Sequence, residues 1–124
     1  MRNASNLAVF CTALVLAGSL PCLAGASGGG RHAAANIESG KAESWVIAFD
    51  ADAPAQVTVS QKQRSAAAIS LNIFDSDGNQ VAAAGGDGHF VVLTWAPTEN
   101  QSYTIVVTNL KSSKTDAVVD LTTN

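Results

Sequence analysis

Cysteine is scarce in this chain and is confined to its first residues. Of 124 residues only Cys11 and Cys22 are cysteine, and both lie within residues 1–26, which have the features of a removable leader. Without that leader the chain has no thiol, which excludes a disulfide scaffold, a thiol nucleophile and a cysteine-ligated zinc site. Stability must then come from packing, and a chain of about 100 residues is long enough to form one modest core.

The sequence also lacks a long hydrophobic run. A membrane-spanning helix needs about 20 apolar residues, and the longest run here extends only from Leu7 to about Leu20, between Arg2 and the helix-breaking Pro21. The small residues of the segment 24–26 (Ala-Gly-Ala) follow. A basic end, a short apolar core and an A-x-A motif are typical of a secretory signal peptide rather than an uncleaved anchor. We therefore predict a signal peptide over residues 1–26, export to the periplasm or extracellular space, and no membrane insertion after cleavage.

Positive charge is sparse and dispersed. Loss of Arg2 with the leader changes the formal net charge from −3 to −4. The remaining basic residues are Arg31, Lys41, Lys62, Arg64, Lys111 and Lys114. They form no basic cluster interleaved with aromatic residues, so neither nucleic acid nor an anionic membrane surface is an expected partner.

What the chain does contain is a two-residue hydrophobic period. Residues 27–36, "SGGGRHAAAN", combine glycine with small residues and predict a flexible lead-in. Short runs of alternating apolar and polar residues follow, as expected of strands with one buried face. The residues assigned to the core are Trp45, Ile47, Phe49, Val57, Val59, Ile69, Leu71, Ile73, Val91, Leu93, Trp95, Tyr103, Ile105, Val107, Ala117, Val119 and Leu121.

Turn-forming segments such as "DADAPA" and "APTENQ" separate these runs, and no amphipathic helix lies between them. The alanine-rich "QKQRSAAAIS" has no cap and no apolar stripe, so it predicts a connection rather than a helix. We expect one all-β domain over residues 37–124, an antiparallel β-sandwich of about seven to eight strands. Its terminal run, residues 116–124, is a candidate edge strand that could pair with another chain.

From about Ile37 onward the chain resembles the bacterial pre-peptidase C-terminal (PPC) domain family. The segments that carry the resemblance are "IESGKAESWVIAFDAD", "ISLNIFDSDGNQVAAA" and "ENQSYTIVVTN". The chain departs from the family pattern at residues 101–102, where Gln-Ser replaces a usual glycine, and at Ser70 and Asn72, which replace an acidic pair. The resemblance implies a jelly-roll-like sandwich, of a kind usually appended to exported enzymes, that assists secretion or binds substrate.

Oxygen-bearing side chains at Asp75, Asp77 and Asn79 raise the question of a calcium loop. A loop of the EF-hand type needs glycine at its sixth position and glutamate at its twelfth, where this chain has Gln80 and Gly86. An Asp-Gly pair between two apolar runs is instead a hairpin signal, because glycine accepts the positive φ of the turn. We therefore interpret the segment as a turn, with calcium as the one cofactor still open.

A weaker metal hypothesis combines several loops. Asp50 and Asp52, or Asp87, could converge with Asp75 and Asp77 at one end of the sandwich and form a surface calcium site of oxygen ligands.

The sequence does not favour an enzyme. Its histidines are His32, in the lead-in, and His89, beside the "GGDGH" turn, and no G-x-S-x-G nucleophile motif occurs. Trp45, Trp95 and Tyr103 lie in phase with aliphatic residues, which predicts burial. Trp95, at a strand end, is the tryptophan expected to be partly exposed, and we regard it as a candidate ligand-binding residue.

These observations predict a non-catalytic exported module with a binding or structural, accessory role. Its partner would be an exported protein or a polysaccharide. The alternative is a calcium-dependent substrate- or adhesion-binding module that acts beside an exported hydrolase.

Overall fold

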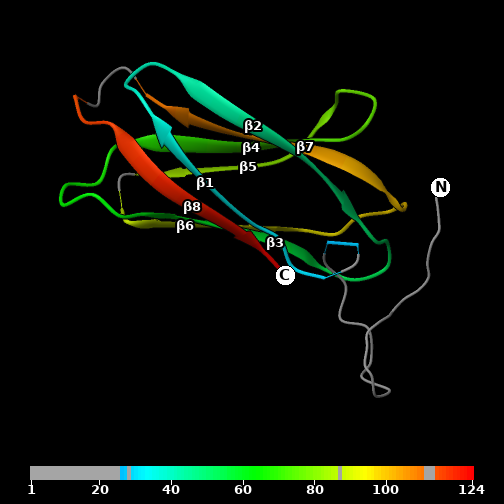
Figure 1. The fold of residues 1–124 in the computed structure, drawn as a ribbon. Coiled ribbons are helices and arrows are strands. Elements are labelled where there is room, and N and C mark those ends of the chain that lie inside the picture. Colours follow the sequence, from blue (N-terminus) through cyan, green and yellow to red (C-terminus); the bar gives the residue numbers. More distant parts are fainter. Residues whose placement is uncertain (1–25, 28, 87, 111–113) are drawn as a thin grey trace.

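The computed structural model describes residues 26–27, 29–86, 88–110 and 114–124, and within these ranges it contains eight strands and no helix (Figure 1). No helix of the described residues could therefore cross a membrane. The predicted signal peptide lies outside the described residues except for Ala26. The strands are β1 (His32–Ile37), β2 (Ala42–Phe49), β3 (Ala55–Gln61), β4 (Ile69–Phe74), β5 (Gln80–Gly86), β6 (Phe90–Trp95), β7 (Gln101–Asn109) and β8 (Ala117–Thr123).

The strands form two four-stranded antiparallel sheets, with the orders β1-β8-β3-β6 and β2-β7-β4-β5. The pairing is nested: β1 pairs with β8, β2 with β7, β3 with β6 and β4 with β5. Nested pairs divided between two facing sheets make an eight-stranded jelly roll, and Figure 1 shows the two layers. The predicted all-β, jelly-roll-like antiparallel sandwich is confirmed, and residues 62–68 are the connection expected between β3 and β4.

The core lies between the two sheets and is made by the alternating apolar residues. Every residue that the two-residue period assigned to the core is buried, except Trp45, which is half-buried. Phe49, Trp95 and Tyr103 meet edge to face in the core, with ring centroids 4.9 to 5.9 Å apart. The prediction that Trp95 is the more exposed tryptophan is wrong: Trp95 is 9% exposed, because the rings of Phe49 and Tyr103 pack against it.

The flexible lead-in predicted for residues 27–36 is wrong from His32 onward, because these residues form β1. Ala33 pairs with Leu121 and Ala35 with Val119. Earlier in the segment, the backbone N–H of Ser27 donates to the carbonyl oxygen of Ala48. Alanine and glycine have little strand preference of their own, but the ladder of hydrogen bonds to β8 orders them. Ala26, just before this segment, is also buried and forms a β-bridge with Phe49.

The terminal run is not an edge strand, which corrects a second expectation. β8 lies between β1 and β3, because β1, which was not predicted as a strand, pairs with the side of β8 that was expected to be free. The edge strands are β1 and β6 in one sheet and β2 and β5 in the other.

Candidate binding site

Three connections meet at one end of the sandwich: residues 50–54, 75–79 and 96–100. They carry most of the negative charge of the described residues. The carboxylates at this end are Asp50, Asp52, Asp75, Asp77 and Glu99. Arg31, just before β1, is the one cationic side chain that the described residues place there. We call this end, with its three connections, the acidic end.

The opposite end has a nearly balanced charge. Its connections, residues 38–41, 62–68 and 114–116, together with the start of β2, carry described cations and anions in similar number. The cations are Lys41, Lys62, Arg64 and Lys114, and the anions are Glu38, Glu43 and Asp116. The surplus of negative charge therefore belongs to the acidic end and not to the surface as a whole.

Hydrogen bonds between the loops of the acidic end hold them in place. The backbone N–H of Ala51 donates to Oδ1 of Asn100 at 2.6 Å, and the N–H of Asp52 donates to the carbonyl oxygen of Pro97 at 3.3 Å. The hydroxyl and N–H of Ser76 both donate to Oε1 of Gln101, at 2.6 and 3.0 Å. Each connection is thus tied to a neighbouring element, so the carboxylates are presented on a fixed frame.

Residues 75–79 form the turn between β4 and β5. Oδ1 of Asp75 accepts hydrogen bonds from the backbone N–H groups of Asp77 and Asn79, at 3.0 and 2.9 Å. The N–H of Gly78 donates to the carbonyl oxygen of Asp75, and Gly78 has φ +86°. This is a turn capped by an aspartate side chain, as the Asp-Gly pair predicted. One oxygen of Asp75 therefore already serves the backbone.

The weaker calcium hypothesis fails for the carboxylates that the structure describes. No group of three His, Cys, Asp or Glu side chains among the described residues is placed to hold a metal ion. Asp50 instead accepts a hydrogen bond from the hydroxyl of Ser27 at 2.6 Å. Asp87, the remaining member of that hypothesis, lies outside the described residues.

Tyr103 lies beneath the acidic end, and its hydroxyl accepts a hydrogen bond from Nε2 of Gln101 at 3.3 Å. Burial raises the pKa of Tyr103 above 10.0, the hydrogen bond from Gln101 opposes the rise, and the charges of Asp75 and Glu99 add to it. The indole N–H of Trp95 is buried and, among the described residues, has no acceptor at good hydrogen-bonding geometry. The charges of Asp75 and Glu99 thus act on the hydroxyl of Tyr103 in the same direction as its burial.

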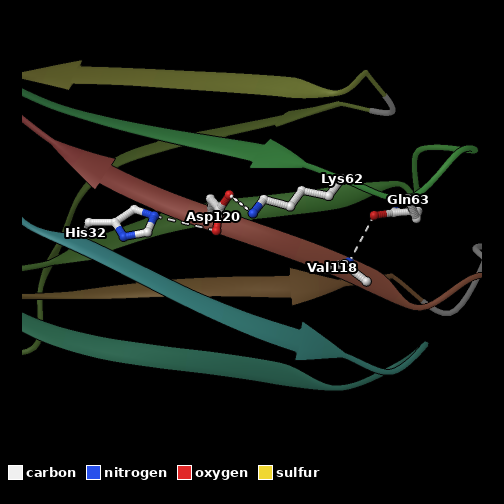
Figure 2. A network of polar contacts seen from close by, with 5 residues as sticks. All are labelled: His32, Lys62, Gln63, Val118 and Asp120. Carbon is white, nitrogen blue, oxygen red and sulfur yellow. Dashed lines mark hydrogen bonds and ion pairs between the residues drawn. The ribbon is translucent and has the colours of Figure 1, made fainter.

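A second polar cluster crosses the outer face of the sheet that contains β8 (Figure 2). Nζ of Lys62 lies 2.8 Å from Oδ2 of Asp120, and Nε2 of His32 lies 3.5 Å from Oδ1 of the same carboxylate. The hydrogen bond from Lys62 lowers the pKa of Asp120 below 3.8, and the charges of Lys62 and His32 lower it further, against partial desolvation. The backbone N–H of Val118 also donates to Oε1 of Gln63. The cluster joins β1, β8 and the connection after β3.

The two histidines contact different groups. His32 faces Asp120, whereas Nε2 of His89 lies 3.1 Å from the carbonyl oxygen of Gln63. Sequence reasoning missed the cluster around Asp120 because it placed His32 in a flexible segment. The alternation of "DAVVDLTT" does put Asp120 on the outer face, but finding its partners requires the register of β1 and β3.

Comparison with known proteins supports the fold. No protein-family model matches the chain, and no curated protein matches its sequence. Among solved structures, the crystal structure of PliG from Aeromonas hydrophila, a periplasmic lysozyme inhibitor of g-type lysozyme, is similar, with a TM-score of 0.55. The match covers 77% of this chain and 84% of that chain at 14% sequence identity. At this level of identity the similarity shows a shared fold.

Proposed function

We propose that this chain is a non-catalytic exported module that binds another exported protein through its acidic end. The observation that carries the proposal is the concentration of five carboxylates on three loops that are hydrogen-bonded to their neighbours. Loops on a rigid scaffold are where binding residues are most often found. A surface of one charge sign attracts a partner of the opposite sign and raises the rate of association. The expected partner therefore presents a cationic surface.

The shared fold with PliG supports the choice of the first partner to test. PliG is described as a periplasmic inhibitor of g-type lysozyme, so a protein that shares this fold can inhibit an enzyme. The predicted signal peptide and the PPC resemblance agree with an exported, accessory role, and we keep both as proposals. A polysaccharide partner stacked on Trp95 is not favoured, because Phe49 and Tyr103 pack against that ring.

The test measures the affinity for g-type lysozyme by isothermal titration calorimetry at low and moderate salt. The variant D52N/D77N/E99Q removes three exposed charges from the acidic end and leaves the Asp75 cap in place. Asparagine tolerates the positive φ of 72° at position 52. We expect a loss of affinity of about tenfold or more and a flatter salt dependence.

The matched control is E38Q/E43Q/D116N, which makes the same change in net charge at the other end. It should change the affinity by less than about twofold, since its sites lie away from the proposed contact. An equal loss for both variants would show a general charge effect and would contradict the acidic end as the site. No binding by the parent chain would exclude g-type lysozyme as the partner. Reduced lysis of peptidoglycan by the lysozyme, in the presence of the chain, would identify the binding as inhibition.

A further inference from the structure

β6 is an edge strand without the charged residues or proline that often protect an edge against pairing. Its sequence, "FVVLTW", has no charged residue, no proline and no glycine. The neighbouring edge strand of the other sheet, β5, is also uncharged. β5 and β6 are consecutive strands and close the same side of the sandwich (Figure 1). The edges on the other side differ, because β1 contains His32 and β2 contains Glu43.

The hydrogen bonds of β3 show which backbone groups of β6 face outward. The N–H of Gln61 donates to the carbonyl oxygen of His89, on the β6 side, whereas the N–H of Lys62 donates to Val118, on the β8 side. Odd-numbered residues of β3 therefore direct their backbone N–H and C=O groups toward β6. In an antiparallel ladder, the residues directly opposite them on β6 direct their own N–H and C=O groups back toward β3. By the observed register those partners are Val91, Leu93 and Trp95.

It follows that the N–H and C=O groups of Phe90, Val92 and Thr94 point away from β3, toward the free edge. No strand of the described chain pairs with β6 on that side. The side chains of the same residues lie on the outer face, where Phe90 is 71% exposed and Val92 is 49% exposed. The edge thus offers hydrogen-bonding groups and apolar surface together, which makes it a template for a further strand.

We propose that the strand that pairs with this edge is β6 of a second copy of this chain. Antiparallel pairing about a two-fold axis sets Val92 opposite Val92 of the second copy and Phe90 opposite its Thr94. Each outward-facing pair would exchange two backbone hydrogen bonds. β-Branched and aromatic pairs of this kind stabilise neighbouring strands. The two sheets that contain β6 would then form one continuous sheet.

The distribution of charge favours a second copy at this side and disfavours it elsewhere. Two copies of a chain with surplus negative charge repel each other if their acidic ends meet. Within β5 and β6 themselves no like charges meet, because the thirteen residues of these two described strands are uncharged. A two-fold contact places identical surfaces together, so an uncharged edge suits it.

The test is the molar mass of the purified exported chain, measured by sedimentation and light scattering from about 1 to several hundred µM. We expect a dimer for the parent chain and a dissociation constant at least tenfold higher for Val92→Lys, because a lysine on an edge opposes pairing. Thr94→Lys, at another outward position, is a second variant in case the first unfolds, and thermal melts check both.

The matched control is Val46→Lys on β2. This position is on the opposite side, is 69% exposed and undergoes the same change of charge, so the dimer should persist. A monomeric parent chain over the whole range would overturn the proposal and leave the edge to a strand of another protein. Equal dissociation by the β6 and β2 variants would also overturn it. Neither result depends on binding at the acidic end.

Discussion

Asn109 donates a hydrogen bond from Nδ2 to the backbone carbonyl oxygen of Ile37 at 2.8 Å, across 72 positions of sequence. The same nitrogen donates to the carbonyl oxygen of Thr115 at 2.9 Å. Asn109 is buried at the end of β7, and Ile37 ends β1 in the other sheet. One side-chain amide therefore fastens the two sheets and the β7–β8 connection, in a described chain that has no cysteine.

The first prediction concerns this amide. Asn109→Ala leaves two partly or fully buried carbonyl oxygens without their donor, so the free energy of unfolding should fall by about 2 to 3 kcal/mol. The measurement is urea denaturation. Asn72→Ala is the control, because the Asn72 amide bonds to Gln80 on the exposed outer face and should change stability by less than about 0.5 kcal/mol. Equal effects of the two substitutions would refute the role assigned to Asn109.

Asn109 also marks the limit of what the sequence predicts. The two-residue period located the core because large side chains in alternation leave one arrangement that buries them. β1 was not recognised, since half of its residues are alanine, and β5, rich in alanine and glycine, was indicated only as the second arm of the Asp-Gly hairpin. Their strand conformation comes from the partners to which they bond, β8 and β4. A buried amide such as Asn109 looks like any polar strand-end residue until its distant partner is known.

The candidate site was also predictable only in part. The turn at Asp75 was predictable because a local signal, the Asp-Gly pair, fixes it. The gathering of Asp50, Asp75 and Glu99 at one end depends on the directions of eight strands, and the ion pair of Asp120 with Lys62 depends on register. Both are relations between segments far apart in sequence, which a pattern within one segment does not contain.

The second prediction separates backbone strain from steric conflict in the β4–β5 turn. Gly78 has φ +86°, and an added Cβ would meet no atom within 4 Å. Gly78→Ala should therefore cost about 1 kcal/mol through backbone strain alone. Gly78→Asn should cost less, because asparagine tolerates this conformation better. Thermal or urea denaturation measures both, and an alanine variant as stable as the parent chain would show that the turn readily changes its type.

The third prediction concerns calcium and the same turn. Because Oδ1 of Asp75 already accepts two backbone N–H groups, millimolar calcium should leave the melting temperature unchanged. Isothermal titration with calcium should show no heat beyond dilution. A saturable heat that disappears in Asp77→Asn would contradict this and would revive the calcium-dependent alternative, since Asp77 is exposed and is not needed for the cap.

The fourth prediction follows the pKa of Asp120. Lys62 and His32 hold that pKa below 3.8, so the ionised carboxylate is more favoured in the folded chain than in the unfolded chain. Its contribution to stability is complete above about pH 5 and is lost as the pH falls through the folded pKa. The Asp120→Asn variant lacks this contribution, so near neutral pH its free energy of unfolding should be lower than that of the parent chain. This gap between the two free energies should narrow below about pH 4.

Urea denaturation across the acidic range measures that gap. In a chain that already carries Lys62→Met, Asp120→Asn should lower the free energy of unfolding at neutral pH by a smaller amount, because Lys62 gives the closest contact with the carboxylate, at 2.8 Å. The side chain of Asp120 is 16% exposed, so salt should weaken the effect only in part. A gap that stays constant with pH would show that Asp120 acts through packing and not through its charge.

The last prediction uses Tyr103, the single tyrosine of the chain. Burial raises the pKa of its phenol above 10.0, so the phenolate should appear at higher pH in the folded chain than in the chain unfolded by urea. The associated stability is fully present below pH 10 and is lost as the pH rises through the folded pKa, because the unfolded chain then ionises first. Glu99→Gln should lower the folded pKa, since the charge of Glu99 raises it, whereas Asp116→Asn, at the opposite end, should not. Phenolate absorbance during alkaline titration measures all three. If folded and unfolded chains ionise at the same pH, then Tyr103 is open to water and the acidic end does not act on the core.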